Sequence, residues 1–179
     1  IYLLLATMIA PSLIKLGVNP IAAHMFVLYF GLMSMITPPV AIAAFAAASL
    51  SGAKPMETGM TAVRLGWIAY VIPFVFVLSP SLLGQGDLAH IALATVTAFA
   101  GVWIASCGLI GYLFGPLSVL MRLLFFVSGI LLLLPADAIP SGLLVNAAGL
   151  ILAVVVVMKD LAANKDKRKA AKVAAAAGE

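Results

Sequence analysis

The chain has 179 residues, of which 65% are hydrophobic and 9% are charged, and its net charge is +4. Its mean hydropathy of +1.24 lies far above the usual value for a water-soluble globular domain. This composition excludes a soluble enzyme and predicts an all-α protein that crosses a lipid bilayer several times. The single cysteine, Cys107, excludes an internal disulfide.

Six apolar segments follow one another along the chain, separated by glycine, proline and polar residues. They cover residues 1–16, 21–50, 61–80, 88–114, 117–135 and 139–158. Because about 20 apolar residues cross the hydrocarbon core as a helix, we expect a polytopic membrane protein. Pro11 should kink the short first segment, which is either a span or one arm of a re-entrant hairpin. The chain starts inside this apolar segment without a methionine or a signal-peptide pattern, so we expect a fragment of a longer protein.

The second segment is predicted to be a broken helix. As one helix it would be about 45 Å long, whereas the hydrocarbon core is about 30 Å thick. Its middle reads Ser34-Met35-Ile36-Thr37-Pro38-Pro39-Val40, and the two prolines lack the amides that would pair with the carbonyls of Ser34 and Met35. We therefore expect the helix to open near the bilayer midplane and to resume at Pro39.

A helix opened at this depth can bind ions. The carbonyl end of its first half suits a cation, and the amide end of its second half suits an anion. Thr37 and Ser34 add hydroxyl groups, and Gly31 leaves room for a neighbouring element. The alternative is a proline kink that only shapes packing, with both hydroxyls bonded back to freed carbonyls. The residues predicted to bind sodium and a carboxylate substrate are Gly31, Ser34, Met35, Ile36, Thr37, Pro38 and Pro39, with Ser34 and Thr37 as sodium ligands.

The remaining polar residues suggest anchoring and packing. Arg64, Trp67 and Tyr70 are expected to form an interfacial belt. Gly108, Gly111 and Gly115 in the fourth segment include one GxxxG motif, which predicts a helix contact. The two histidines, His24 and His90, have no acidic or thiol neighbours at metal-ligand spacing. The two acids that we place near membrane depth, Asp87 and Asp137, fall in predicted turns. We therefore predict no catalytic residue, no cofactor and no metal other than the sodium ion at the broken helix.

The basic residues predict the orientation, because cytoplasmic loops of membrane proteins hold an excess of them. The tail at 159–179 contains six of the ten basic residues. With this tail in the cytoplasm, nine basic residues fall on the cytoplasmic side and Lys15 alone falls outside. The tail lacks interleaved aromatic residues, so we expect it to signal topology and not to bind nucleic acid.

Several short stretches occur in an order that resembles a known family. They are Ala10-Pro11, Leu16-Gly17-Val18-Asn19-Pro20, His24 to Gly31, Ile36-Thr37-Pro38-Pro39-Val40 and Gly66 to Pro73. Residues 1–83 resemble the C-terminal part of the large permease subunit of TRAP (tripartite ATP-independent periplasmic) transporters. The likeness is closest to the TAXI branch, whose small and large membrane subunits are often fused. Residues 84–158 resemble the additional membrane segment of about three helices on some fused permeases, followed by the basic cytoplasmic tail.

This resemblance implies a sodium-coupled secondary transporter of the bacterial or archaeal inner membrane. It would take a small organic acid from a periplasmic solute-binding protein and import it without ATP, together with the rest of the permease and the small membrane subunit. Residues 1–16 resemble the returning arm of the second hairpin, and 31–40 resemble one side of a sodium site. Some relatives have an acid or amide where Met35 stands, which leaves backbone carbonyls, Ser34 and Thr37 as ligands. The alternative is a structural or assembly domain without an ion or substrate site.

Overall fold

The computed structural model describes residues 1–136 and 140–176, with side chains to residue 165. The described residues form helices and no β-strand, so the prediction of an all-α membrane protein is confirmed. Contacts divide the chain into two units, Ile1–Ala92 and Leu93–Glu179, each of which we describe by itself. The predicted domain boundary after residue 83 stays a prediction, and the predicted turn at Asp137 lies outside the described residues.

Unit 1 is built from short helices. They are α1 (Tyr2–Met8), α2 (Ala10–Lys15), α3 (Pro20–Met33), α4 (Ile42–Ser51), α5 (Pro55–Leu65), α6 (Ile68–Leu78) and the 3₁₀ helix η1 (Pro80–Leu83). The kink expected at Pro11 is present, because α1 and α2 meet at Ile9. The break expected in the second segment is also present. Its second half begins at Ile42, however, and not at Pro39 as predicted.

The third apolar segment differs more from the prediction. It begins at Pro55 and not at residue 61, because α5 occupies most of the stretch that we expected to be a link. Together α5 and α6 form Pro55–Leu78, one of three stretches among the described residues that are long and apolar enough to cross a membrane. The helix is interrupted at Gly66 and Trp67 between α5 and α6. The other two such stretches are Leu88–Ile110 and Gly142–Lys165.

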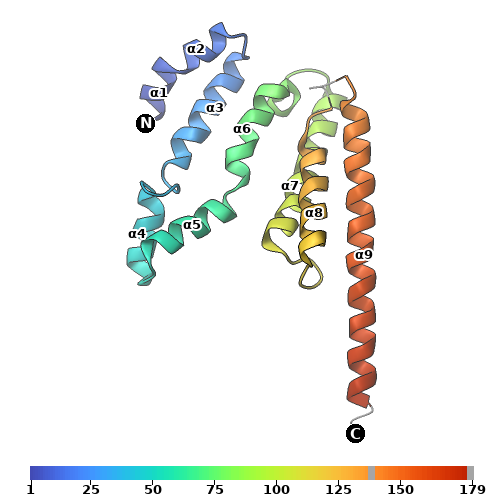
Figure 1. The fold of residues 1–179 in the computed structure, drawn as a ribbon. Coiled ribbons are helices and arrows are strands. Elements are labelled where there is room, and N and C mark those ends of the chain that lie inside the picture. Colours follow the sequence, from blue (N-terminus) through green and yellow to red (C-terminus); the bar gives the residue numbers. More distant parts are fainter. Residues whose placement is uncertain (137–139, 177–179) are drawn as a thin grey trace. The chain divides into compact units, whose positions relative to one another are not determined.

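Helix α3 lies between the α1–α2 pair and α6, in contact with each of them (Figure 1). Its start is fixed by Asn19, whose side-chain oxygen accepts hydrogen bonds from the amides of Ile21 (2.9 Å) and Ala22 (3.4 Å). The Asn19 amide group also donates to Gln85 Oε1 at 2.7 Å. This bond connects the loop after η1 to the start of α3.

Unit 2 is a helical hairpin with a third helix beside it. It contains most of α7 (Leu88–Ile110), α8 (Val119–Leu133) and α9 (Gly142–Ala176), and α9 packs along α8 (Figure 1). Helices α7 and α8 approach so closely that a Cβ on Gly129 would lie 2.4 Å from the backbone nitrogen of Ala105. The glycines for which we predicted a helix contact do lie against other helices: a Cβ on Gly108 would lie 2.7 Å from the Arg122 carbonyl oxygen of α8, and one on Gly115 would lie 2.4 Å from Asn164 Oδ1 of α9. Gly111 and Gly115, however, lie in the loop after α7 and not within the span, as we expected.

This α7–α8 loop is held by polar side chains. The buried Asp160 of α9 accepts hydrogen bonds from the Phe114 amide (3.2 Å) and from the Asn164 side chain (3.4 Å). Arg122 donates to the carbonyls of Gly108 (3.2 Å) and Leu109 (2.9 Å), which lie in the last turn of α7. These bonds close one end of unit 2 and satisfy backbone groups that would otherwise be costly in a membrane.

The role of Asp160 can be tested by two substitutions. We expect Asp160→Leu to destabilise unit 2 by about 1–3 kcal/mol, because the partly buried Phe114 amide then loses its acceptor. Asp160→Asn keeps a side-chain oxygen that can accept this bond, so it should unfold near the wild-type temperature. Thermal unfolding of the purified protein in detergent measures both. Equal unfolding temperatures for wild type and Asp160→Leu would show that the loop does not depend on this carboxylate.

Candidate functional site

The predicted site lies at the break between α3 and α4. The chain turns through residues 34–40, and Ala41 then adopts a left-handed conformation with φ of 36°. Several backbone hydrogen bonds order this turn, among them Thr37 N–H to Met33 O, Ala41 N–H to Thr37 O and Ala43 N–H to Met35 O, each 3.0 Å. The break is therefore a defined loop. The prolines leave the Met35 carbonyl without its helical partner, and the amide of Ala43, eight residues further on, donates to it instead.

Other carbonyls at the break remain open. Within the part of the chain that the structure describes, no amide donates to the backbone oxygens of Ser34, Ile36, Pro38 or Pro39. Each of these oxygens has two lone pairs, and inside a bilayer such a group requires a partner. A cation is one partner that carbonyl oxygens can bind, so this set of atoms fits the predicted sodium ion.

The two predicted hydroxyl ligands differ in their surroundings. Ser34 Oγ donates to the Gly31 carbonyl at 2.7 Å, which is the bond expected of a repaired kink. Thr37 Oγ1 lies 2.5 Å from the Met33 carbonyl oxygen and 2.6 Å from the hydroxyl of Tyr70. Thr37 thus joins the broken helix to α6, a contact that a local kink does not require.

The structure brings some of the predicted residues together and separates others. A cavity of about 340 Å³ lies at the break. It is lined by Ser34, Thr37, Pro38 and Pro39 together with Phe30, Met33, Val40 and Tyr70. Gly31 faces α1 instead, since a Cβ there would lie 3.4 Å from side-chain atoms of Ile1 and Leu5. The Ile36 side chain packs against Gly66, where a Cβ would lie 3.0 Å from its Cδ1 atom.

Tyr70 is the lining residue that sequence reasoning placed elsewhere. We expected it in an interfacial belt, but its hydroxyl bonds Thr37 and its ring lines the cavity. Its position four residues after Gly66 was a weak sequence signal for a place at the site, because a glycine between two apolar helices often marks a bend.

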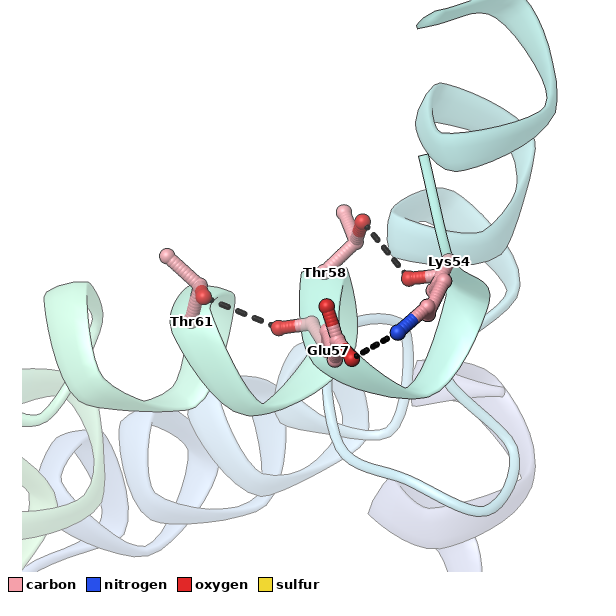
Figure 2. A network of polar contacts seen from close by, with 4 residues as sticks. All are labelled: Lys54, Glu57, Thr58 and Thr61. Atoms are coloured by element: carbon pink, nitrogen blue, oxygen red, sulfur yellow. Dashed lines mark hydrogen bonds and ion pairs between the residues drawn. The ribbon is translucent and has the colours of Figure 1, made fainter. Parts of the chain in front are cut away.

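Helix α5 packs against the break through Gly59. A Cβ on Gly59 would lie 2.7 Å from Pro38 Cγ, so only glycine fits. A different face of α5 is polar and exposed, as Figure 2 shows. Its network comprises a Lys54–Glu57 ion pair at 2.8 Å, a bond from Thr58 to the Lys54 carbonyl at 3.0 Å and one from Thr61 to the Glu57 carbonyl at 2.8 Å. Such exposed pairs contribute little stability, so the Gly59 contact holds α5 at the break.

These features define a class of protein. Apolar helices, one of them opened beside a cavity to which two hydroxyl-bearing side chains of the break contribute, are typical of a membrane permease. The family model of the tripartite ATP-independent periplasmic transporter, DctM component, matches residues 1–91, just over half of the 179 residues. The chain therefore belongs to this family, which is a family of transporter permeases and not of enzymes. No curated protein and no solved structure matched the chain.

The match confirms the resemblance at the level of the TRAP permease family. It covers the helices that form the broken-helix site, and it ends one residue before the end of unit 1. Membership implies an integral membrane protein that works with a periplasmic binding protein and other membrane subunits. The second unit lies wholly outside the match.

Proposed function

We propose that this chain is part of the permease of a sodium-coupled secondary transporter of the TAXI branch, which imports a small organic acid without ATP. Family membership supports the permease role and the partnership with a periplasmic binding protein. The observation that supports the coupling ion is the break itself, where residues 34–39 include the Thr37 hydroxyl and four carbonyls to which no described amide donates. In this proposal the chain lies in the inner membrane with its basic C-terminal tail in the cytoplasm.

The charge of the site favours a monovalent cation. The two acidic residues of unit 1, Glu57 and Asp87, lie at the start of α5 and just before α7, outside the cavity lining. A cation at the break would therefore be held by neutral oxygens and by the negative end of α3, without a carboxylate from unit 1. Such a site does not fully compensate a divalent charge in a membrane, whereas a sodium ion together with an anionic substrate is neutral as a pair.

The substrate carboxylate would bind at the start of α4. Among the described residues, the amides of Ile42 and Ala44 have no carbonyl partner. Free amides at the first turn of a helix attract anions, and they lie on the other side of the break from the α3 carbonyls. The proposed pair of sodium and carboxylate would thus join the two half-helices across their gap.

For unit 2 we propose the structural alternative. Its polar residues Arg122 and Asp160 bind backbone groups of the α7–α8 hairpin, and its glycines bring α7 and α8 into close contact. These features assemble helices.

Sodium-driven uptake tests the function. The complete transporter is reconstituted in proteoliposomes with its binding protein, and organic acid uptake is compared with and without an inward sodium gradient. We expect uptake to follow the gradient, and Thr37→Val to raise the sodium concentration for half-maximal uptake at least about tenfold, because an oxygen ligand of a charged ion is lost.

The matched control is Thr61→Val, which removes a hydroxyl from the exposed face of α5 (Figure 2). It should transport with the wild-type sodium response. Wild-type uptake that ignores sodium would refute the coupling ion, and an unchanged sodium response of Thr37→Val would refute the site.

A further inference from the structure

We infer that the Tyr70 hydroxyl occupies the position at Thr37 that a coupling cation would take, so that Tyr70 and the ion compete for the same oxygen. This inference rests on the proposed function, because it concerns the regulation of the proposed ion site. It assigns to Tyr70 the role of a positioning residue that lowers the affinity for sodium. Binding of the ion would release Tyr70 and with it α6.

The hydrogen-bond donors at Thr37 can be assigned from the two contacts of its oxygen. Thr37 has one hydroxyl proton, and the Met33 carbonyl 2.5 Å away can only accept a hydrogen bond. The Thr37 proton therefore points to Met33, and Tyr70, at 2.6 Å, must donate its own proton to Thr37. A metal cation binds an oxygen through a lone pair and is repelled by a proton aimed at that atom. Tyr70 and a cation therefore exclude each other on this side of Thr37.

The competing positions open into one cavity. Thr37 and Tyr70 both line the cavity of about 340 Å³ at the break. The open carbonyls of Ser34, Pro38 and Pro39 belong to residues of the same lining. An ion that replaces the Tyr70 proton would thus find further oxygens nearby, and the released Tyr70 ring would have space to move.

Release of Tyr70 would act on the junction between α5 and α6. Tyr70 lies one helical turn after Gly66, where the span is interrupted and where the Ile36 side chain packs. Ile36 precedes Thr37, and Pro38, which follows it, packs on Gly59 of α5. The residues around Thr37 therefore contact both helices, so ion occupancy can change the angle at which α5 and α6 meet.

The variant Tyr70→Phe tests the competition. It removes the competing hydroxyl and keeps the ring, so we expect the sodium concentration for half-maximal uptake to fall about three- to tenfold, the equivalent of one hydrogen bond. In Thr37→Val, where the shared oxygen is absent, adding Tyr70→Phe should not change the sodium response further.

The matched control is Tyr29→Phe. The Tyr29 ring packs on Phe76, and among the described residues its hydroxyl makes no hydrogen bond. This variant should keep the wild-type sodium response. Tyr70→Leu removes the same hydroxyl as Tyr70→Phe and is measured beside it, so that the result does not depend on the folding of one variant.

The outcomes separate this inference from the proposed function. If wild-type uptake depends on sodium but the variants at Tyr70 need as much sodium or more, Tyr70 is a bystander or a ligand and the competition is refuted. The sodium coupling then still stands. If wild-type uptake is indifferent to sodium, the coupling and the competition fall together.

Discussion

Gly59→Val is expected to abolish sodium-driven uptake while the chain still inserts into the membrane. A Cβ on Gly59 would lie 2.7 Å from Pro38 Cγ and 3.4 Å from Phe45 Cε1. The proline ring is fixed to the backbone and cannot rotate away, so α5 or the loop of the break must move. Overpacking of this kind costs about 1–3 kcal/mol, and small displacements of binding groups can lower a rate about a hundredfold.

The measurement is the initial uptake rate at saturating sodium, normalised to the amount of protein in the membrane. Gly59→Ala adds one methyl group and should give an intermediate rate. Thr58→Val is the matched control, because it puts a valine at the adjacent position and removes only the bond to the Lys54 carbonyl (Figure 2). A wild-type rate for Gly59→Val would show that α5 does not press on Pro38 in the working transporter.

The break was predictable from sequence because proline acts locally. Pro38 and Pro39 have no amide protons, so a helix that enters them must lose its hydrogen bonds whatever surrounds it. The point at which the helix resumes was not predictable in the same way. Ala41 is completely buried in a left-handed conformation that an alanine rarely adopts, so packing and not local preference sets the start of α4 at Ile42.

The site was predictable in part. Thr37 followed from the proline pattern, but its partner Tyr70 is 33 positions away, and no sequence period joins the two residues. Gly59 gave a usable signal, because a glycine inside a helix is unfavourable by about 1 kcal/mol relative to alanine and so suggests a close contact. We missed it because the stretch before residue 61 was expected to be a link and not a helix.

In unit 2, the predicted end of the last helix determined whether the role of Asp160 could be predicted. We ended the last span at residue 158 and assigned the rest to a basic tail, so Asp160 was treated as a tail residue. The helix continues to Ala176, and the helical span extends to Lys165, which places Asp160 on the same helix as the apolar residues before it. An acidic residue near the end of a span is a stronger sequence signal of a structural contact than the glycine motif at Gly111 and Gly115.

Gly129→Leu is expected to prevent the folding of unit 2. A Cβ on Gly129 would lie 2.4 Å from the nitrogen of Ala105, 2.6 Å from its Cβ and 2.6 Å from the carbonyl oxygen of Gly101. None of these atoms belongs to a side chain that can rotate away, so α7 and α8 would have to separate. Small residues at such a contact let helix backbones approach, which is a main source of helix association in a membrane.

We expect the yield of monodisperse Gly129→Leu protein in size-exclusion chromatography to fall about tenfold, since overpacking by whole side chains costs at least about 1–3 kcal/mol. Val127→Leu is the matched control, because Val127 lies on an exposed face of the same helix. A normal yield of Gly129→Leu would refute the close contact of α7 and α8. The substitution changes only the packing of unit 2. Sodium-driven uptake by the small amount of folded protein would therefore support a transport site in unit 1. Loss of uptake in that fraction would instead give unit 2 a direct part in transport.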